Sequence, residues 1–83
     1  MYNFFEVNQM KLRIRDLRED NDLLQRHLAQ YLHCRQQTYS RYETGEVEPP
    51  LAVMEQLARY YNTSVDYLMG LTDNPTPYER GRA

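Results

Sequence analysis

The stretch Leu28-Ala29, followed by Thr38-Tyr39-Ser40-Arg41-Tyr42-Glu43 and then by Gly45, decides the fold of this chain. The pattern predicts two short helices joined by a tight turn, with the small side chain of Ala29 where the helices approach closely. The second helix begins with the polar run Arg35-Gln36-Gln37-Thr38, whose side chains can touch the edges of bases. A helix pair of this size is the geometry that lays its second helix in the major groove of DNA.

The apolar residues of the first half divide it into three helices. Met10, Ile14 and Leu17 have the spacing of an amphipathic helix, and this helix is expected to end near Asn21-Asp22 because Asn tolerates the left-handed conformation. The next helix turns Leu28, Ala29 and Leu32 inward, and His33-Cys34 forms the turn. The third helix is predicted from about Gln36 to Thr44, with Tyr39 and Tyr42 on its inner face and Gly45 as its stop.

Two further helices are predicted after a loop that contains the paired prolines 49 and 50. The inward face of the fourth helix is expected to hold Leu51, Met54, Leu57, Ala58 and Tyr61. Asn62 can close this helix. Ser64 is the expected N-cap of a short fifth helix that contains Val65, Tyr67 and Leu68 and ends at Gly70.

The chain therefore divides into a lead-in over residues 1–9, a helical domain over residues 10–70 and a flexible tail over residues 71–83. No segment shows the alternation of apolar and polar residues that predicts a sheet. The lead-in is compatible with a short strand, a frayed segment or a dimer contact.

Composition describes an ordinary globular protein, with 41% hydrophobic and 27% charged residues in 83 positions. The one cysteine cannot form an internal disulfide, so a reducing compartment, the cytoplasm, is expected. The N-terminus lacks the pattern of a secretory signal, and no apolar run approaches the roughly 20 residues that span a bilayer.

The net charge of −2 is unusual for a protein that contacts phosphates, but the charges are distributed unevenly. Between residues 25 and 43, Arg26, Arg35 and Arg41 stand against Glu43 alone. The segments on either side hold more acidic than basic residues. The locally positive segment coincides with the helix pair that is expected to face DNA.

A set of short segments between residues 23 and 70 is specific through its order and spacing. It comprises Leu23-Leu24-Gln25, Leu28-Ala29, Leu32, Gln37-Thr38, Ser40-Arg41-Tyr42-Glu43, Gly45, Glu48-Pro49, Leu57-Ala58 and Ser64-Val65-Asp66-Tyr67-Leu68-Met69-Gly70. This set resembles the Cro/C1-type helix-turn-helix family, the xenobiotic-response-element-like regulators and phage repressors. The resemblance implies a compact, all-α, five-helix domain of the lambda-repressor-like fold, with the helix-turn-helix at its second and third helices. It also implies binding to operator DNA, usually as a two-fold dimer.

The resemblance also implies roles for individual residues. Gln36 and Gln37 match positions that read bases, and Arg41 matches one that reaches base or backbone. The DNA backbone is expected to be contacted by Gln25, Arg26, Arg35, Ser40 and Thr44. Arg18 and Glu43 match a buried ion pair that locks the first helix to the third. Departures from the family pattern are His33 in place of glycine, Leu24 and Arg35 at cap positions, Tyr39 in place of isoleucine, and an acidic loop with Glu46 and Glu48.

His27, His33 and Cys34 are the residues that a metal or nucleophile hypothesis would use. Their spacing matches no zinc pattern, because a structural site requires four ligands and a second Cys or His group is absent. No base or acid can be paired with Cys34 for catalysis. The expectation is therefore no metal, no cofactor and no enzymatic activity.

Two functions from different classes remain open. The first is a sequence-specific regulator, most simply a repressor, that binds double-stranded operator DNA. The alternative is a protein-interaction module of the same fold, such as an antitoxin-like protein whose acidic second half faces its partner. A homodimer is expected through the fifth helix and the lead-in, where the apolar residues Tyr2, Phe4, Phe5, Tyr67 and Met69 lie. Alternatively, Phe4 and Phe5 fold back over the protein's own core.

Overall fold

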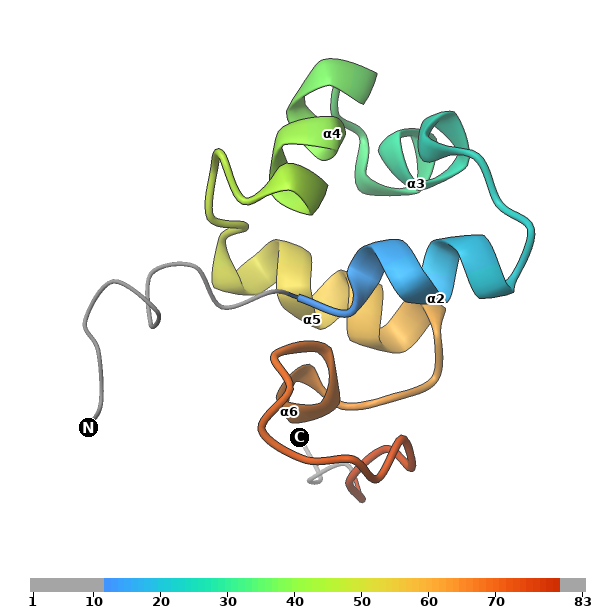
Figure 1. The fold of residues 1–83 in the computed structure, drawn as a ribbon, viewed down its shortest axis with the longest axis vertical. Helices are drawn as coiled ribbons and strands as arrows, with labels where there is room; N and C mark the ends of the chain where they lie inside the picture. Colours follow the sequence, from blue (N-terminus) through green and yellow to red (C-terminus); the bar gives the residue numbers. More distant parts are fainter. Residues whose placement is uncertain (1–11, 80–83) are drawn as a thin grey trace.

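The computed structural model describes residues 12–79, and over this range the chain forms five helices and no strand (Figure 1). The helices are α2 (Ile14–Asp20), α3 (Gln25–Leu32), α4 (Gln36–Thr44), α5 (Leu51–Tyr60) and α6 (Val65–Leu68). This architecture confirms the all-α, five-helix fold that the sequence predicts. The bounds of α4 agree with the prediction at both ends.

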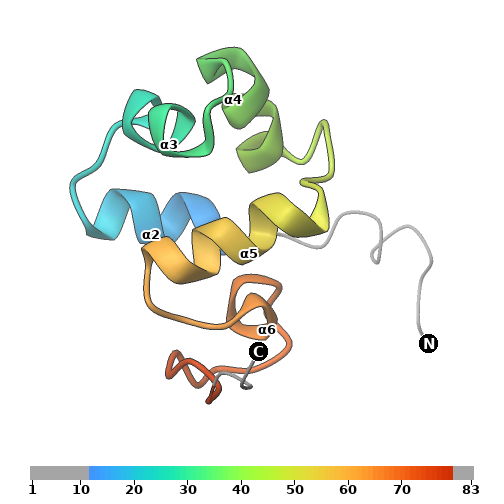
Figure 2. The same ribbon diagram turned by 180° about the vertical axis from the view of Figure 1, so that it is seen from behind.

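The helices are arranged in three levels around one core. Figure 1 and the reverse view in Figure 2 place α3 and α4 at one end, α2 and α5 across the middle, and α6 at the opposite end. Every helix contributes at least one fully or almost fully buried side chain. These core residues are Ile14, Leu28, Ala29, Leu32, Tyr39, Tyr42, Met54, Leu57, Ala58 and Leu68. The inward residues predicted for α3 and α4 all belong to this core.

The turn between α3 and α4 is built on a residue with positive φ. His33 adopts the left-handed conformation, with φ of 56°, and the Cys34 N–H donates to the Ala29 carbonyl at 3.0 Å. A side chain other than glycine pays a steric penalty of about 1–2 kcal/mol in this region of backbone space. His33 therefore adopts the left-handed conformation although it has a side chain where the family usually has glycine. Gly45, with φ of 82°, ends α4 in the same conformation.

Three details of the predicted helices differ from the structure. Leu51 was expected to face inward, but it is 76% exposed because it opens α5 at the edge of the core. The left-handed residue after α2 is Asp22, with φ of 56°, rather than Asn21. Tyr61 follows α5 instead of lying within it and is half-buried. Met10 lies outside the described residues.

Two helix starts are capped by side chains that hydrogen-bond to the backbone. Ser64 Oγ accepts from the Tyr67 N–H at 3.0 Å, which makes Ser64 the N-cap of α6 as the sequence predicts. At α3, the N-cap residue Leu24 has no polar side chain. Instead, its backbone N–H donates to His27 Nδ1 at 2.9 Å. His27 thus satisfies one of the free donors at the start of a helix.

The segment after α6 makes several polar contacts with the helical body. Thr63 Oγ1 donates to the Pro75 carbonyl at 2.6 Å, and the Tyr78 hydroxyl donates to Asp66 at 2.8 Å. Arg13 donates to the Thr72 carbonyl at 2.9 Å and pairs with Asp73 at 2.7 Å. Residues 72–78 therefore contact both the start of the described chain and the region around α6.

The apolar residues proposed for a dimer contact have a different setting from the one expected. Met69 packs against the core, and the ring of Tyr67 lies under the guanidinium of Arg13, 4.2 Å from its carbon to the ring centroid. Both residues are half-buried within their own chain, so each leaves part of its side chain exposed. Tyr2, Phe4 and Phe5 lie outside the described residues.

Candidate nucleic-acid interface

The two faces of α4 have opposite characters. Tyr39 is completely buried and Tyr42 is 8% exposed, whereas Gln36, Gln37 and Arg41 are exposed to solvent. Because residues three or four apart share one face of a helix, the two tyrosines anchor one face and leave the other free. The helix thus presents an amide pair near its start and a guanidinium one turn later.

The start of α4 also presents free backbone donors. Its N-cap, Arg35, has extended backbone angles, and its side chain makes no capping hydrogen bond. The first N–H groups of a helix have no partner within the helix, and the helix dipole is positive at this end. Such a helix start favours a phosphate or another anion.

A shallow surface depression of about 460 Å³ lies beside this exposed face of α4. Five residues from the sequence-predicted DNA-contacting set line it together with one acidic residue. The lining residues are Gln25, Gln36, Gln37, Ser40, Arg41 and Glu46. Residues from the start of α3, from α4 and from the following loop therefore form one continuous surface.

Behind this surface, Arg18 of α2 and Glu43 of α4 form a close two-point ion pair. Arg18 Nε donates to Glu43 Oε2 at 2.7 Å, and Arg18 Nη2 donates to Glu43 Oε1 at 3.1 Å. The Glu43 side chain is 2% exposed and that of Arg18 is 12% exposed. Arg18 Nη1 also donates to the Leu23 carbonyl at 3.0 Å. The structure thus brings together the two residues that the resemblance pairs.

The ion pair changes the proton affinities of both partners. The hydrogen bond to Glu43 raises the pKa of Arg18 above its ordinary value despite the opposing effect of burial. Burial by itself would raise the pKa of Glu43, but the hydrogen bonds from Arg18 and Gln25 outweigh it and lower that pKa. Both groups are therefore held in their charged forms, because a buried charge is stable when it is paired and hydrogen-bonded.

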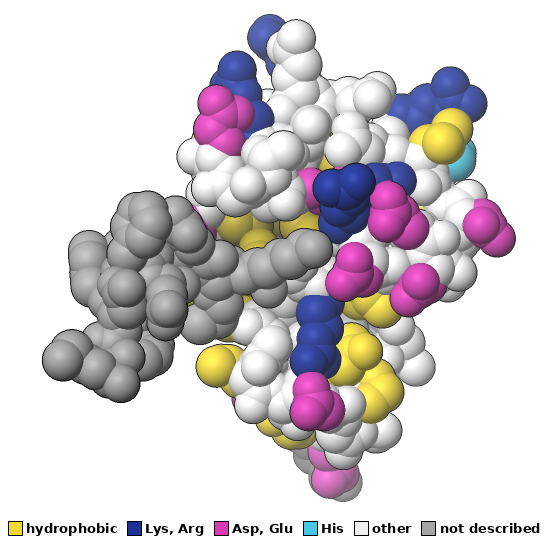
Figure 3. Space-filling model, in the orientation of Figure 1, with side chains coloured by type: hydrophobic (Ala, Val, Ile, Leu, Met, Phe, Trp, Pro, Cys, Tyr) yellow, Lys and Arg dark blue, Asp and Glu magenta, His cyan; other side chains and the backbone are white. Residues whose placement is uncertain are grey.

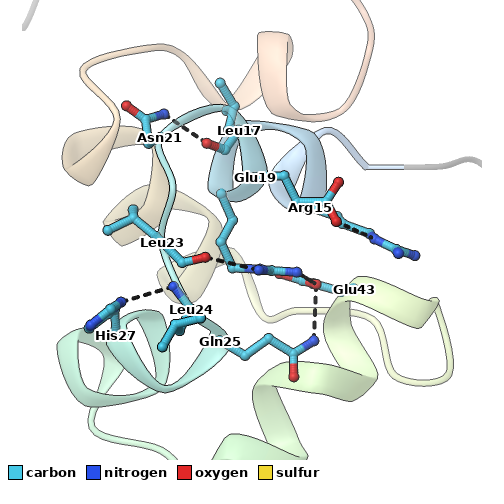
Figure 4. A network of polar contacts seen from close by, with 10 residues as sticks. Arg15, Leu17, Glu19, Asn21, Leu23, Leu24, Gln25, His27 and Glu43 are labelled. Carbon is cyan, nitrogen blue, oxygen red and sulfur yellow. Dashed lines mark hydrogen bonds and ion pairs between the residues drawn. The ribbon is translucent and has the colours of Figure 1, made fainter.

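Gln25 links the buried pair to the surface. Its Nε2 donates to Glu43 Oε1 at 3.1 Å, as Figure 4 shows for the labelled Gln25 and Glu43. An amide nitrogen carries two hydrogens, so this bond leaves the second hydrogen and the carbonyl oxygen of Gln25 for another partner. Gln25 therefore both joins α3 to α4 and lines the depression.

Three of the predicted DNA-backbone residues do not line the depression. Arg26 and Arg35 are exposed on either side of the turn region. Thr44 is exposed too, but its hydroxyl is engaged at the end of α4. It donates to the Arg41 carbonyl at 3.1 Å and accepts from the Glu46 N–H at 3.3 Å.

Glu46 is a residue of this surface that the sequence does not place there. Its carboxylate Oε2 lies 3.4 Å from Arg41 Nε, and both side chains are more than half exposed. The loop folds back because Gly45 has positive φ and because the Val47 N–H donates to the Arg41 carbonyl at 3.2 Å. The sequence shows that the loop after α4 is acidic, but it does not show that the Glu46 side chain points toward Arg41.

His27, His33 and Cys34 serve the local backbone in this structure. His27 caps α3 and His33 forms the turn, as described above. Burial raises the pKa of the half-buried Cys34 thiol above its ordinary value, which favours the unreactive protonated form. Within residues 12–79, no group of three or more His, Cys, Asp or Glu side chains is placed to hold a metal ion.

The charges also differ between the level of α3 and α4 and the level of α2. Figure 3 shows basic side chains over α3 and α4, and several acidic side chains beside them at the level of α2. The exposed acidic residues of α2 and the turn after it are Asp16, Glu19, Asp20 and Asp22. Since Glu43 is buried and paired, it does not offset the exposed arginines of the helix pair. None of the described helices has the length and apolarity that crossing a membrane requires.

Comparison with known proteins agrees with this geometry. The helix-turn-helix family matches residues 14–68, from the start of α2 to the end of α6. The uncharacterized HTH-type transcriptional regulator YobD of Bacillus subtilis (strain 168) is 42% identical over 65 residues, covering 78% of this chain and 58% of that protein. No solved structure matches the chain significantly.

A second relative comes from a phage. The cryptic phage CTXphi transcriptional repressor RstR of Vibrio cholerae is 37% identical over 57 residues, covering 69% of this chain and 51% of that protein. The chain thus spans a little over half the length of each of these relatives. Family members of this kind are DNA-binding proteins and not enzymes, as the sequence predicts. The match over all five described helices shows that the chain belongs to the Cro/C1-type helix-turn-helix family.

Proposed function

We propose that this protein is a sequence-specific DNA-binding transcriptional regulator that reads operator DNA in the major groove with α4. The observation that carries the proposal is the depression on α4, where Gln25, Gln36, Gln37, Ser40 and Arg41 share one exposed surface. In the helix-turn-helix geometry, the second helix of the pair enters the major groove and its first residues face the bases. Gln36 and Gln37 are the first two residues of α4.

The chemistry of the exposed residues suits the reading of base edges. A glutamine amide offers a donor and an acceptor in one plane, which matches N6 and N7 of adenine. Arg41 lies one helical turn farther along the same surface and can donate to guanine or to a phosphate. Gln36, Gln37 and Arg41 are therefore the proposed base-reading residues.

Contacts with the DNA backbone would hold α4 in register. Gln25 retains a free amide hydrogen, and Ser40, which precedes Arg41 in α4, also lines the depression. Arg26, Arg35 and Thr44 are exposed around this surface, and the two arginines add positive charge. We assign these five residues to phosphate contacts, which position a protein on the duplex without reading sequence. Thr44 would have to release the hydrogen bond from its hydroxyl to the Arg41 carbonyl in order to donate to a phosphate.

Repression by occupying an operator is the simplest form of this regulation. RstR, which matches 69% of the chain, is named a transcriptional repressor. A bound protein that covers an operator excludes polymerase without needing a further activity. This supports repression as the proposed outcome of binding.

A homodimer is the proposed binding unit. One recognition helix covers only a few base pairs, and related domains bind two half-sites about one DNA turn, or roughly 34–36 Å, apart. Sedimentation at micromolar concentration, with and without the selected DNA, tests this. Two protein chains per duplex are expected, and a single chain per site would refute the dimer.

The test of DNA reading starts with selection of the best duplex from a random library. Gln37→Ala is expected to lower affinity for that duplex by about 1–3 kcal/mol and to leave non-specific binding nearly unchanged. Gln56→Ala is the matched control, because Gln56 is an exposed glutamine of α5 that does not line the depression. An equal loss on both DNAs would remove Gln37 from base reading.

The same experiment separates DNA binding from the protein-interaction alternative. Binding that depends on phosphate contacts weakens steeply as salt increases. A protein that forms no salt-sensitive, sequence-preferring complex would instead be an interaction module of the same fold. The acidic second half of the chain would then be the surface that faces the partner.

A further inference from the structure

We propose that Glu46 is a positioning residue that presents Arg41 to a guanine in the operator. The inference rests on the proposed function, because it assigns a base to a residue of the same surface. Glu46 and Arg41 line one depression with Gln36 and Gln37, and the carboxylate lies 3.4 Å from Arg41 Nε.

The Glu46 carboxylate approaches Arg41 from the side of its guanidinium. The shortest contact of the ion pair joins Glu46 Oε2 to Nε, on the side of the guanidinium, rather than to one of the terminal nitrogens Nη1 and Nη2. Those two nitrogens are the end-on pair of donors that fits two acceptors side by side. Guanine offers two such acceptors, O6 and N7, in the major groove. A carboxylate on the Nε side therefore orients the arginine without occupying the donors that read the base.

Hydrogen bonds fix the backbone of Glu46 relative to Arg41. The Thr44 hydroxyl donates to the Arg41 carbonyl at 3.1 Å and accepts from the Glu46 N–H at 3.3 Å. The Val47 N–H closes the same loop on the Arg41 carbonyl at 3.2 Å. Three hydrogen bonds and the positive φ of Gly45 thus hold the acidic residue beside the arginine.

The negative charge of Glu46 has the same sign as the phosphates of DNA. An exposed carboxylate on a surface that meets phosphates repels DNA and weakens binding to every sequence. Glu48 carries the same charge in the same loop but does not line the depression. The two glutamates therefore share the general repulsion, and only Glu46 is placed to act through Arg41.

Separate effects on specificity and on general affinity follow from this arrangement. Glu46→Ala is expected to reduce the preference for guanine at one operator position by about two- to fivefold, the range of an exposed ion pair. The affinity of the Glu46→Ala variant for non-specific DNA is expected to rise. Glu48→Ala is the matched control, which should raise affinity for both DNAs and leave the base preference intact.

Two further variants test whether the effect passes through Arg41. Glu46→Gln keeps an oxygen that can accept from Nε, so it should retain more of the guanine preference than Glu46→Ala. In an Arg41→Ala background, Glu46→Ala should have no more effect on base preference than Glu48→Ala. Affinity for operators with each base pair substituted in turn measures all of these effects.

The possible results separate the inference from the function on which it rests. If Glu46→Ala raises the affinity for operator and for non-specific DNA equally, Glu46 only repels DNA, and the proposal is overturned. A loss of preference that persists without Arg41 would make Glu46 a base reader itself and also overturn it. If Arg41→Ala changes no single position while Gln37→Ala still does, operator reading stands and the role given to Glu46 falls.

Discussion

The two arginine–glutamate pairs that involve α4 have the same chemistry and opposite settings. Arg18 and Glu43 are joined at 2.7 Å with side chains that are 12% and 2% exposed. Arg41 and Glu46 lie 3.4 Å apart with side chains that are 57% and 66% exposed. Arg41 and Glu43 are two residues apart on one helix, so α4 directs one pair inward and the other outward.

Burial decides what each of these two ion pairs contributes. A buried pair leaves an uncompensated charge in the interior when one partner is lost, which strongly destabilises the fold. An exposed pair is screened by water and salt, and its partners can exchange for other charged groups at little cost. The inner pair is therefore part of the scaffold, and the outer pair is available to a ligand.

The largest expected effect comes from removing Arg18. Arg18→Met leaves Glu43 buried without its ionic partner and is expected to lower the free energy of unfolding by about 3–5 kcal/mol. Urea denaturation at pH 7 measures the loss. Arg59→Met is the control, because Arg59 and Glu55 form an exposed pair at 2.9 Å. A loss for Arg18→Met no larger than that of the control would contradict the distinction between the pairs.

A smaller effect is expected from acid, which removes part of the same stabilisation. The pKa of Glu43 in the folded protein lies below its ordinary value of 4.5, so the unfolded state binds a proton more readily. Stability from this group is thus fully present above that ordinary value and is lost as pH falls through the folded pKa. Unfolding measured from pH 7 downward should show a shallower acid loss in Glu43→Gln. Parallel curves for the two proteins would count against a charged Glu43.

The smallest expected effect belongs to the outer pair. Glu46→Gln is expected to change the free energy of unfolding by less than about 1 kcal/mol. The change should shrink in about 1 M salt, where screening acts over roughly 3 Å. Thermal or urea unfolding at two salt concentrations measures it. A loss as large as that of Arg18→Met would show that the loop after α4 belongs to the scaffold.

Much of the inner side of α4 could be predicted from the sequence. The spacing of Tyr39 and Tyr42 sets the buried face, and Gly45 sets the end of the helix. The partnership of Arg18 with Glu43, 25 residues away, came from the family resemblance and not from local spacing. A contact between distant segments depends on how helices pack, which a single sequence does not encode in its periodicity.

The outer side was less predictable because it depends on loop geometry. Glu46 reaches Arg41 only because a positive φ at Gly45 and the Thr44 hydroxyl turn the chain back. The apolar residue Leu51 shows the same limit of prediction. Helical spacing alone predicts that it faces inward, but it is the first residue of α5 and is exposed to solvent. In both cases the sequence gives the chemical character of the side chain but not the direction in which it points.

The division of α4 into a fixed face and a free face bears on how such a protein can acquire new targets. Positions 36, 37 and 41 face solvent, whereas positions 39, 42 and 43 are enclosed by other helices. Mutations at the first group change what the helix presents while the packing beneath it stays in place. A lineage can therefore shift from one binding preference to another by single steps, each of which passes through a folded protein.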